Sequence, residues 1–275
     1  MISFGFRGHD FPDNEIGALA RRCHELEVTH LQLALRKSFP DLIRDGVFSP
    51  GLARHLKIEL DRCGVAVSVL GCYINPIHPD EQERQREVSR FCEMLWFAKY
   101  MGADMVGTET GSLGKTPADN RTEAVYQTFT ESMRQIVSCA EKLGVMVGVE
   151  GVTQHTLYSP KMVKKFLDEI GSPNVSVIFD AVNLIDTENA ARQEEMMDEA
   201  FELFGDRISV IHLKDYTVRD GVKQRAEVGE GDFNFRHLFA WCKKNKPYIH
   251  AVVEEIPPEQ VQQTRRFLQE CYDNA

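Results

Sequence analysis

Residues 145–180 read VMVGVEGVTQHTLYSPKMVKKFLDEIGSPNVSVIFD. Val145–Glu150 and Val175–Phe179 are short and almost continuously apolar, which is typical of parallel strands that are buried on both faces. Between them, Pro160–Ile170 is amphipathic and begins with Ser159-Pro160, a capping hydroxyl followed by proline at the first helical position. The stretch therefore predicts a strand, a helix and a second strand in succession.

The same alternation continues along the whole chain. The remaining strand candidates are Ile2–Phe6, His30–Leu35, Val65–Leu70, Asp104–Thr108, Ile208–Leu213 and Ile249–Glu254. The remaining helix candidates are Glu15–Leu26, Pro50–Cys63, Asp80–Met101, Ala118–Leu143, Ala190–Phe204, Phe235–Asn245 and Pro258–Tyr272. Eight strand–helix units of about 34 residues each predict an α/β fold, a single (β/α)8 TIM barrel.

An open doubly wound sheet is the competing architecture. It normally carries a glycine-rich phosphate loop after its first strand, and FGFRGHDF at residues 4–11 matches neither GxGxxG nor the P-loop spacing. No linker or composition shift divides the chain. We therefore expect residues 1–275 to form one domain.

Composition narrows the class of partner. The 275 residues contain 32 Lys and Arg against 42 Asp and Glu, a formal charge of −10, which argues against nucleic-acid binding. No apolar run approaches the roughly 20 residues that span a bilayer, and the N-terminus lacks the features of a secretory signal. Seven dispersed cysteines without a CxxC pair indicate reduced thiols. We expect a cytoplasmic protein that binds neither nucleic acid nor membrane.

Four successive predicted strands finish on side chains that can bind a metal ion: Glu150, Asp180, His212 and Glu254. Active-site residues of a barrel stand at the carboxyl ends of its strands, so these four side chains could converge on one cation. Three carboxylates with one imidazole suit Mn²⁺ or Mg²⁺ best, with Co²⁺ and Zn²⁺ as alternatives. The competing interpretation is four unrelated polar residues where strands emerge into solvent.

Several motifs in this order carry a family resemblance. They are EGVTQH (150–155), FDAVN (179–183), HLKD (212–215), GEGDFNF (229–235) and VVEE (252–255). The chain resembles the xylose isomerase-like barrels, a family of sugar phosphate isomerases and epimerases that also includes hydroxypyruvate isomerases, inosose-processing enzymes and type IV AP endonucleases. The resemblance implies metal binding by the four residues above. In the ketose 3-epimerase branch, the residues matching Glu150 and Glu254 also form the acid/base pair.

Five further residues are candidate substrate contacts. Asn183 stands where the ketose 3-epimerases carry a His, and Arg219 is near the position of an Arg in that branch. Lys214 shares its strand face with His212, so we expect it to point into the site. Glu109 ends the fourth strand between two glycines, and His155 matches a substrate-binding His seen in parts of the family.

The sequence therefore predicts a metal-dependent isomerase or epimerase that acts on a ketose or related small polyol through an enediolate. The alternatives are an inosose-type dehydratase, a non-catalytic sugar-binding barrel and, disfavoured by the acidic charge and the few histidines, an AP endonuclease-like phosphodiesterase. The resemblance also implies a homodimer or tetramer. Sequence does not choose between epimerisation and isomerisation, or between free and phosphorylated sugars.

Overall fold

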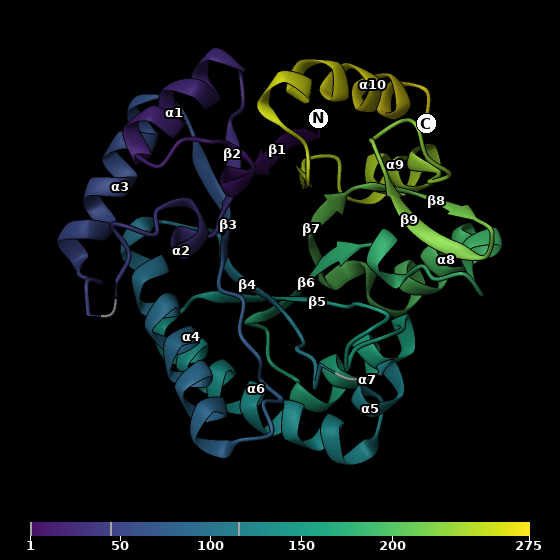
Figure 1. Ribbon diagram of the computed structural model, residues 1–275, viewed down its shortest axis with the longest axis horizontal. Helices are drawn as coiled ribbons and strands as arrows, with labels where there is room; N and C mark the ends of the chain where they lie inside the picture. Colours follow the sequence, from purple (N-terminus) through teal and green to yellow (C-terminus); the bar gives the residue numbers. More distant parts are fainter. Residues whose placement is uncertain (1, 45, 115) are drawn as a thin grey trace.

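A computed structural model describes residues 2–44, 46–114 and 116–275. Eight parallel strands close into a barrel in the order β1-β10-β7-β6-β5-β4-β3-β2, with the helices around it (Figure 1). This arrangement confirms the predicted (β/α)8 barrel. The barrel strands are β1 (Ser3–Arg7), β2 (His30–Leu33), β3 (Ala66–Gly71), β4 (Met105–Glu109), β5 (Met146–Glu150), β6 (Val175–Asp180), β7 (Ile208–Leu213) and β10 (His250–Val253).

The α-helices surround the barrel and include two short ones. They are α1 (Ile16–Glu25), α2 (Leu35–Ser38), α3 (Pro50–Arg62), α4 (Glu81–Met101), α5 (Pro117–Asn120), α6 (Glu123–Leu143), α7 (Pro160–Ile170), α8 (Gln193–Phe204), α9 (Phe235–Asn245) and α10 (Val261–Asp273). None of the helices in the described ranges is long and apolar enough to span a bilayer.

Local sequence explains where several helices begin and end. The Ser159 hydroxyl accepts a hydrogen bond from the Met162 N–H, and Pro160 occupies the first turn of α7. Gly102 and Gly144 end α4 and α6 in the left-handed conformation, at φ 74° and 67°. Glycine adopts this conformation without the steric penalty of a Cβ atom.

The structure differs most from the predicted elements in two places. Residues 118–143 are not one helix, because a new helix starts at Glu123, after Thr122, whose hydroxyl accepts from the Val125 N–H. An antiparallel hairpin, β8 (Asp215–Arg219) and β9 (Val222–Ala226), follows β7 and was not predicted. Its polar sequence has little apolar alternation to mark it as a strand pair.

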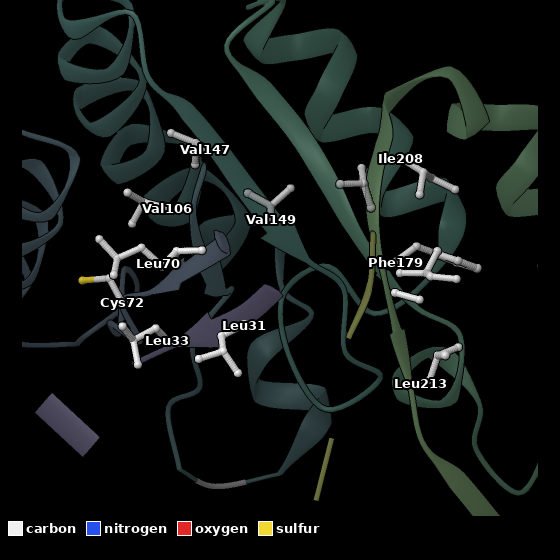
Figure 2. Close-up of a cluster of buried hydrophobic side chains, with 14 of the residues drawn as sticks. Leu31, Leu33, Leu70, Cys72, Val106, Val147, Val149, Phe179, Ile208 and Leu213 are labelled. Carbon is white, nitrogen blue, oxygen red and sulfur yellow. The ribbon is translucent and has the colours of Figure 1, made fainter. Parts of the chain in front are cut away.

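Side chains alternate between the inside and the outside of the barrel. Those that face the helices form the main core, and Figure 2 shows part of it, with Leu31, Val149 and Phe179 among the labelled residues. A second cluster has members on β3, β4, β6, β7 and β10: Val69, Met105, Ile178, Val210 and Val252. Two residues beyond Ile178, Val210 and Val252, the same inward face carries Asp180, His212 and Glu254, so the apolar cluster supports the polar strand ends.

Candidate metal and active site

Four adjacent strands supply the predicted metal ligands. β5, β6, β7 and β10 are consecutive in the barrel, and Asp180 pairs in register with His212, which pairs with Val252. Glu150 and Asp180 end their strands, whereas Glu254 directly follows β10. All four side chains are buried. The barrel therefore brings together residues that are up to 104 positions apart in the chain.

The distances within this cluster suit one ion. Ligand atoms of Glu150, Asp180 and His212 all lie within 4.8 Å of one another. Nδ1 of His212 is 3.4 Å from Oε2 of Glu150 and 3.3 Å from Oε1 of Glu254. Ligand atoms about 2.1 Å from a metal, at tetrahedral or octahedral angles, are about 3.0–3.4 Å apart. The cluster thus has the spacing of a coordination shell.

A hydrogen bond at Nε2 of His212 fixes the orientation of its imidazole ring. Nε2 lies 2.7 Å from Oε1 of Gln32, and since an amide oxygen only accepts, Nε2 must donate. Nδ1 then faces the carboxylates, buried and without a hydrogen bond of good geometry to any described residue. Such an unsatisfied nitrogen between two carboxylates fits a metal ligand that is held by a second hydrogen bond.

Electrostatics support the same reading. Burial opposes a charge on His212, but Glu254 and Glu150 outweigh it and raise its pKa to about 9. Without an ion, a proton on Nδ1 offsets part of the carboxylate charge. Burial also raises the pKa of Asp180, in spite of the nearby Lys214 ammonium. The cluster therefore favours a cation at its centre.

Glu254 lies at the edge of this group, among cations. Its Oε2 is 2.8 Å from Nζ of Lys214 and 3.6 Å from Nη1 of Arg7. Burial would raise its pKa, but His212, Lys214 and Arg7 lower it to about 2, so Glu254 stays ionised. It is not one of the three residues whose ligand atoms all lie within 4.8 Å, although its Oε1 faces Nδ1 of His212.

Lys214 and Asn183 bind the cluster directly. Nζ of Lys214 is 2.9 Å from Oδ2 of Asp180 and 3.2 Å from Oδ1 of Asn183. The Asn183 side-chain amide donates to Oε1 of Glu150 at 2.6 Å, and its backbone N–H donates to Oδ1 of Asp180. Both residues, expected as substrate contacts, thus also hold the carboxylates in place.

Of the other three candidate substrate residues, Glu109 and His155 contact each other, whereas Arg219 lies on the hairpin. Oε2 of Glu109 lies 3.4 Å from Nδ1 of His155, and burial raises the pKa of Glu109 and lowers that of His155. Arg219 instead ends β8, with its side chain 60% exposed and paired with Asp232 at 3.1 Å. The structure does not bring Arg219 to the metal cluster, because the unpredicted hairpin carries it outward.

Sequence reasoning missed Gln32 and the Arg7–Asp10 pair. Asp10 binds Arg7 through both oxygens and accepts from the backbone N–H of Glu255, which has a left-handed φ of 62°. The residue next to Glu254 is therefore held in a strained conformation. Arg7 and Gln32 were detectable signals, since each is a polar residue on the inward face of a barrel strand, near its carboxyl end.

The HLKD and GEGDF motifs meet at Asp215. Its buried carboxylate accepts hydrogen bonds from the backbone N–H groups of Tyr216, Gly229, Gly231 and Phe233. A Cβ atom on Gly231 would lie 2.0 Å from Oδ1 of Asp215, so this approach requires glycine. Asp215 therefore has a structural role: it fastens the loop that follows the hairpin.

Comparison with known proteins identifies the family of this fold. The sequence model of the xylose isomerase-like TIM barrel family matches residues 20–271. Hydroxypyruvate isomerase of Escherichia coli (strain K12) is 22% identical over 132 residues, 46% of this chain and 46% of that protein, so the match spans about half the length of each.

Two solved structures cover almost the whole chain. A D-tagatose 3-epimerase-like protein has a TM-score of 0.78 and 18% identity, over 99% of this chain and 97% of that one. The 3-keto-D-glucoside 4-epimerase of E. coli has a TM-score of 0.75 and 15% identity, over 98% and 100%. At these identities the likeness establishes the fold alone.

Two more distant structures contain a metal ion. The IolI protein, with a bound zinc, has a TM-score of 0.70 and 14% identity, over 99% of this chain and 98% of that one. A Mycobacterium smegmatis barrel, in complex with magnesium, has the same TM-score and identity, over 99% and 96%. Because the family model matches residues 20–271, most of the chain, the chain belongs to the xylose isomerase-like TIM barrel family.

Proposed function

We propose that this chain is a divalent-metal-dependent isomerase or epimerase of a ketose or a related small polyol. The observation that carries the proposal is Nδ1 of His212, which is buried and lies 3.3–3.4 Å from carboxylates of Glu254 and Glu150. Sugar binding alone requires no such group of ionisable side chains in a dry site, because burying them together is costly.

Glu150, Asp180, His212 and Glu254 would hold the ion. Oxygen-rich donors with a single nitrogen favour Mn²⁺ or Mg²⁺. Two structures of similar fold contain zinc or magnesium, which supports a bound divalent cation in this chain and leaves its identity open.

Glu150 and Glu254 are the proposed acid/base pair. A bound divalent ion would stabilise the negative charge that develops on two neighbouring substrate oxygens when a C–H proton leaves. Glu254 is ionised among His212, Lys214 and Arg7, which is the form that a general base requires. Asn183 donates to Glu150 and fixes the direction of its carboxylate.

The position of the two glutamates supports epimerisation. β5 and β10 are the outer strands of the four that form the cluster, so Glu150 and Glu254 approach it from its two sides. Proton removal by one and return by the other would invert a carbon centre. If both proton transfers took place on one face of the substrate, aldose–ketose isomerisation would result. The name of hydroxypyruvate isomerase implies an isomerisation for that relative.

The test is solvent proton exchange from a panel of ketoses and inososes in D₂O, with and without Mn²⁺. We expect Glu150→Gln to abolish exchange while thermal unfolding stays cooperative. Glu169→Gln is the matched control, because Glu169 binds Arg134 on the outside of the barrel, and its exchange should equal that of the wild type.

Other outcomes separate the alternatives. Exchange that is unchanged in Glu150→Gln would remove this residue from the acid/base role. Loss of water from an inosose would identify a dehydratase, and metal-independent sugar binding without exchange would identify a binding protein.

A further inference from the structure

A cavity of about 480 Å³ lies beside the metal cluster, between the β8–β9 hairpin and the loops that follow β5 and β6. Asn183 and Lys214, which bind Glu150, Asp180 and Glu254, also line this cavity. A substrate that reacts at the cluster would therefore extend into it. This volume falls within the range of pockets that hold drug-sized ligands, about 300–1,000 Å³, so it offers room for a substituent beyond the reacting carbons.

The acidic groups that line the cavity are already satisfied. The carboxylate of Asp215 accepts four backbone N–H groups, and Oδ1 of Asp186 accepts two, from Glu188 and Asn189. Glu255 is paired with Arg225 at 3.0 Å. Each of these carboxylates is thus held by partners of its own.

Lys223 is the lining lysine whose ammonium is held by backbone oxygens. It comes from β9, and its Nζ donates to the backbone oxygens of Val182 and Ile185, at 2.5 and 2.7 Å. It forms no ion pair with any residue in the described part of the chain. An ammonium has three N–H groups, so one remains for a ligand. Burial lowers the pKa of Lys223 and the neighbouring charge of Lys214 reinforces this shift, whereas the charges of Asp180 and Asp186 oppose it.

We propose that this cavity binds an anionic group of the substrate, a phosphate or a carboxylate, and that Lys223 is its main counter-charge. The inference rests on the proposed function and narrows its substrate to a charged sugar. A partly buried ammonium with a spare N–H gains a charge-assisted hydrogen bond from such a group. A neutral hydroxyl at the same place would gain a weaker hydrogen bond, because it carries no charge of its own.

The chain contains a matched control for Lys223. Lys246 is also partly buried, and its Nζ donates to two backbone oxygens, those of Asp206 and Ile208. Burial lowers the pKa of Lys246 as well. Lys246 follows α9 and does not line the cavity. Its replacement therefore measures the effect of losing a lysine that only donates to backbone carbonyls.

The experiment compares D-fructose, D-fructose 6-phosphate and D-fructuronate with Mn²⁺-loaded wild type, Lys223→Met and Lys246→Met. Calorimetry measures binding, and proton exchange in D₂O measures turnover. We expect wild type to bind at least one charged sugar more tightly than D-fructose. Lys223→Met should weaken that binding about 10–100-fold, and Lys246→Met should not. The phosphate and uronate arms identify which anion is preferred.

The inference is overturned if neither charged sugar binds wild type more tightly than D-fructose. It is also overturned if Lys223→Met weakens the binding of all three sugars equally, since Lys223 would then only hold the hairpin in place. Failure of the proposed function looks different: a charged sugar would bind in a Lys223-dependent manner, yet none of the three would exchange protons.

Discussion

Replacement of Gln32 by leucine tests whether metal binding depends on the orientation of His212. Both residues are buried, and the bond between them is 2.7 Å long. Gln32→Leu keeps a similar volume but leaves the Nε2–H of His212 without its acceptor, a loss of about 1–3 kcal/mol. The imidazole is then free to carry its proton on Nδ1 instead. Loss of such outer-shell partners typically lowers metal affinity about 10–100-fold, equivalent to about 1.4–2.7 kcal/mol.

The assay is calorimetric titration of Mn²⁺ into chelator-treated wild type and Gln32→Leu at pH 7. Tyr73→Phe is the control, because the Tyr73 hydroxyl contacts Nε2 of Gln32 at 2.9 Å and its removal leaves the Gln32–His212 bond intact. We expect Tyr73→Phe to bind Mn²⁺ almost as wild type does. Wild-type affinity in folded Gln32→Leu would refute the reasoning, as would an equal loss in Tyr73→Phe.

Two further predictions concern stability. Burial, aided by the adjacent His250, lowers the pKa of His30 to about 4 from 6.5. Between pH 6.5 and pH 4, His30 therefore binds a proton in the unfolded chain but not in the native protein. The contribution of His30 to the free energy of unfolding is full above pH 6.5 and falls by about 3 kcal/mol towards pH 4. Urea unfolding of His30→Gln should show a flatter acid limb than wild type, and parallel limbs would contradict this. Gly231→Ala, whose Cβ would lie 2.0 Å from Asp215, should cost about 1–3 kcal/mol in urea unfolding. Gly51→Ala, with its nearest contact at 3.8 Å, should cost nothing, and equal losses in both variants would count against the steric argument.

Local sequence patterns were enough to predict the barrel and many of the polar residues of the site. Short β-rich runs identified every barrel strand within a few residues, and several of them are nearly continuous in apolar character because both faces of a parallel strand are covered. Strict alternation placed Glu254 on the face of Val252. The hairpin at 215–226 escaped detection because its two strands are short and mostly polar, so apolar periodicity hardly marks them.

Short-range periodicity was sufficient to predict the strand–helix alternation and to show which side chains stand at the strand ends. The folded barrel alone brings Gln32 to His212 across 180 positions, Arg7 to Glu254, and Lys223 to the cavity. Those contacts depend on how the barrel closes β1 onto β10 and on where the hairpin folds. The physical reason is that closure and register are properties of all the strands together, which no local stretch of sequence encodes.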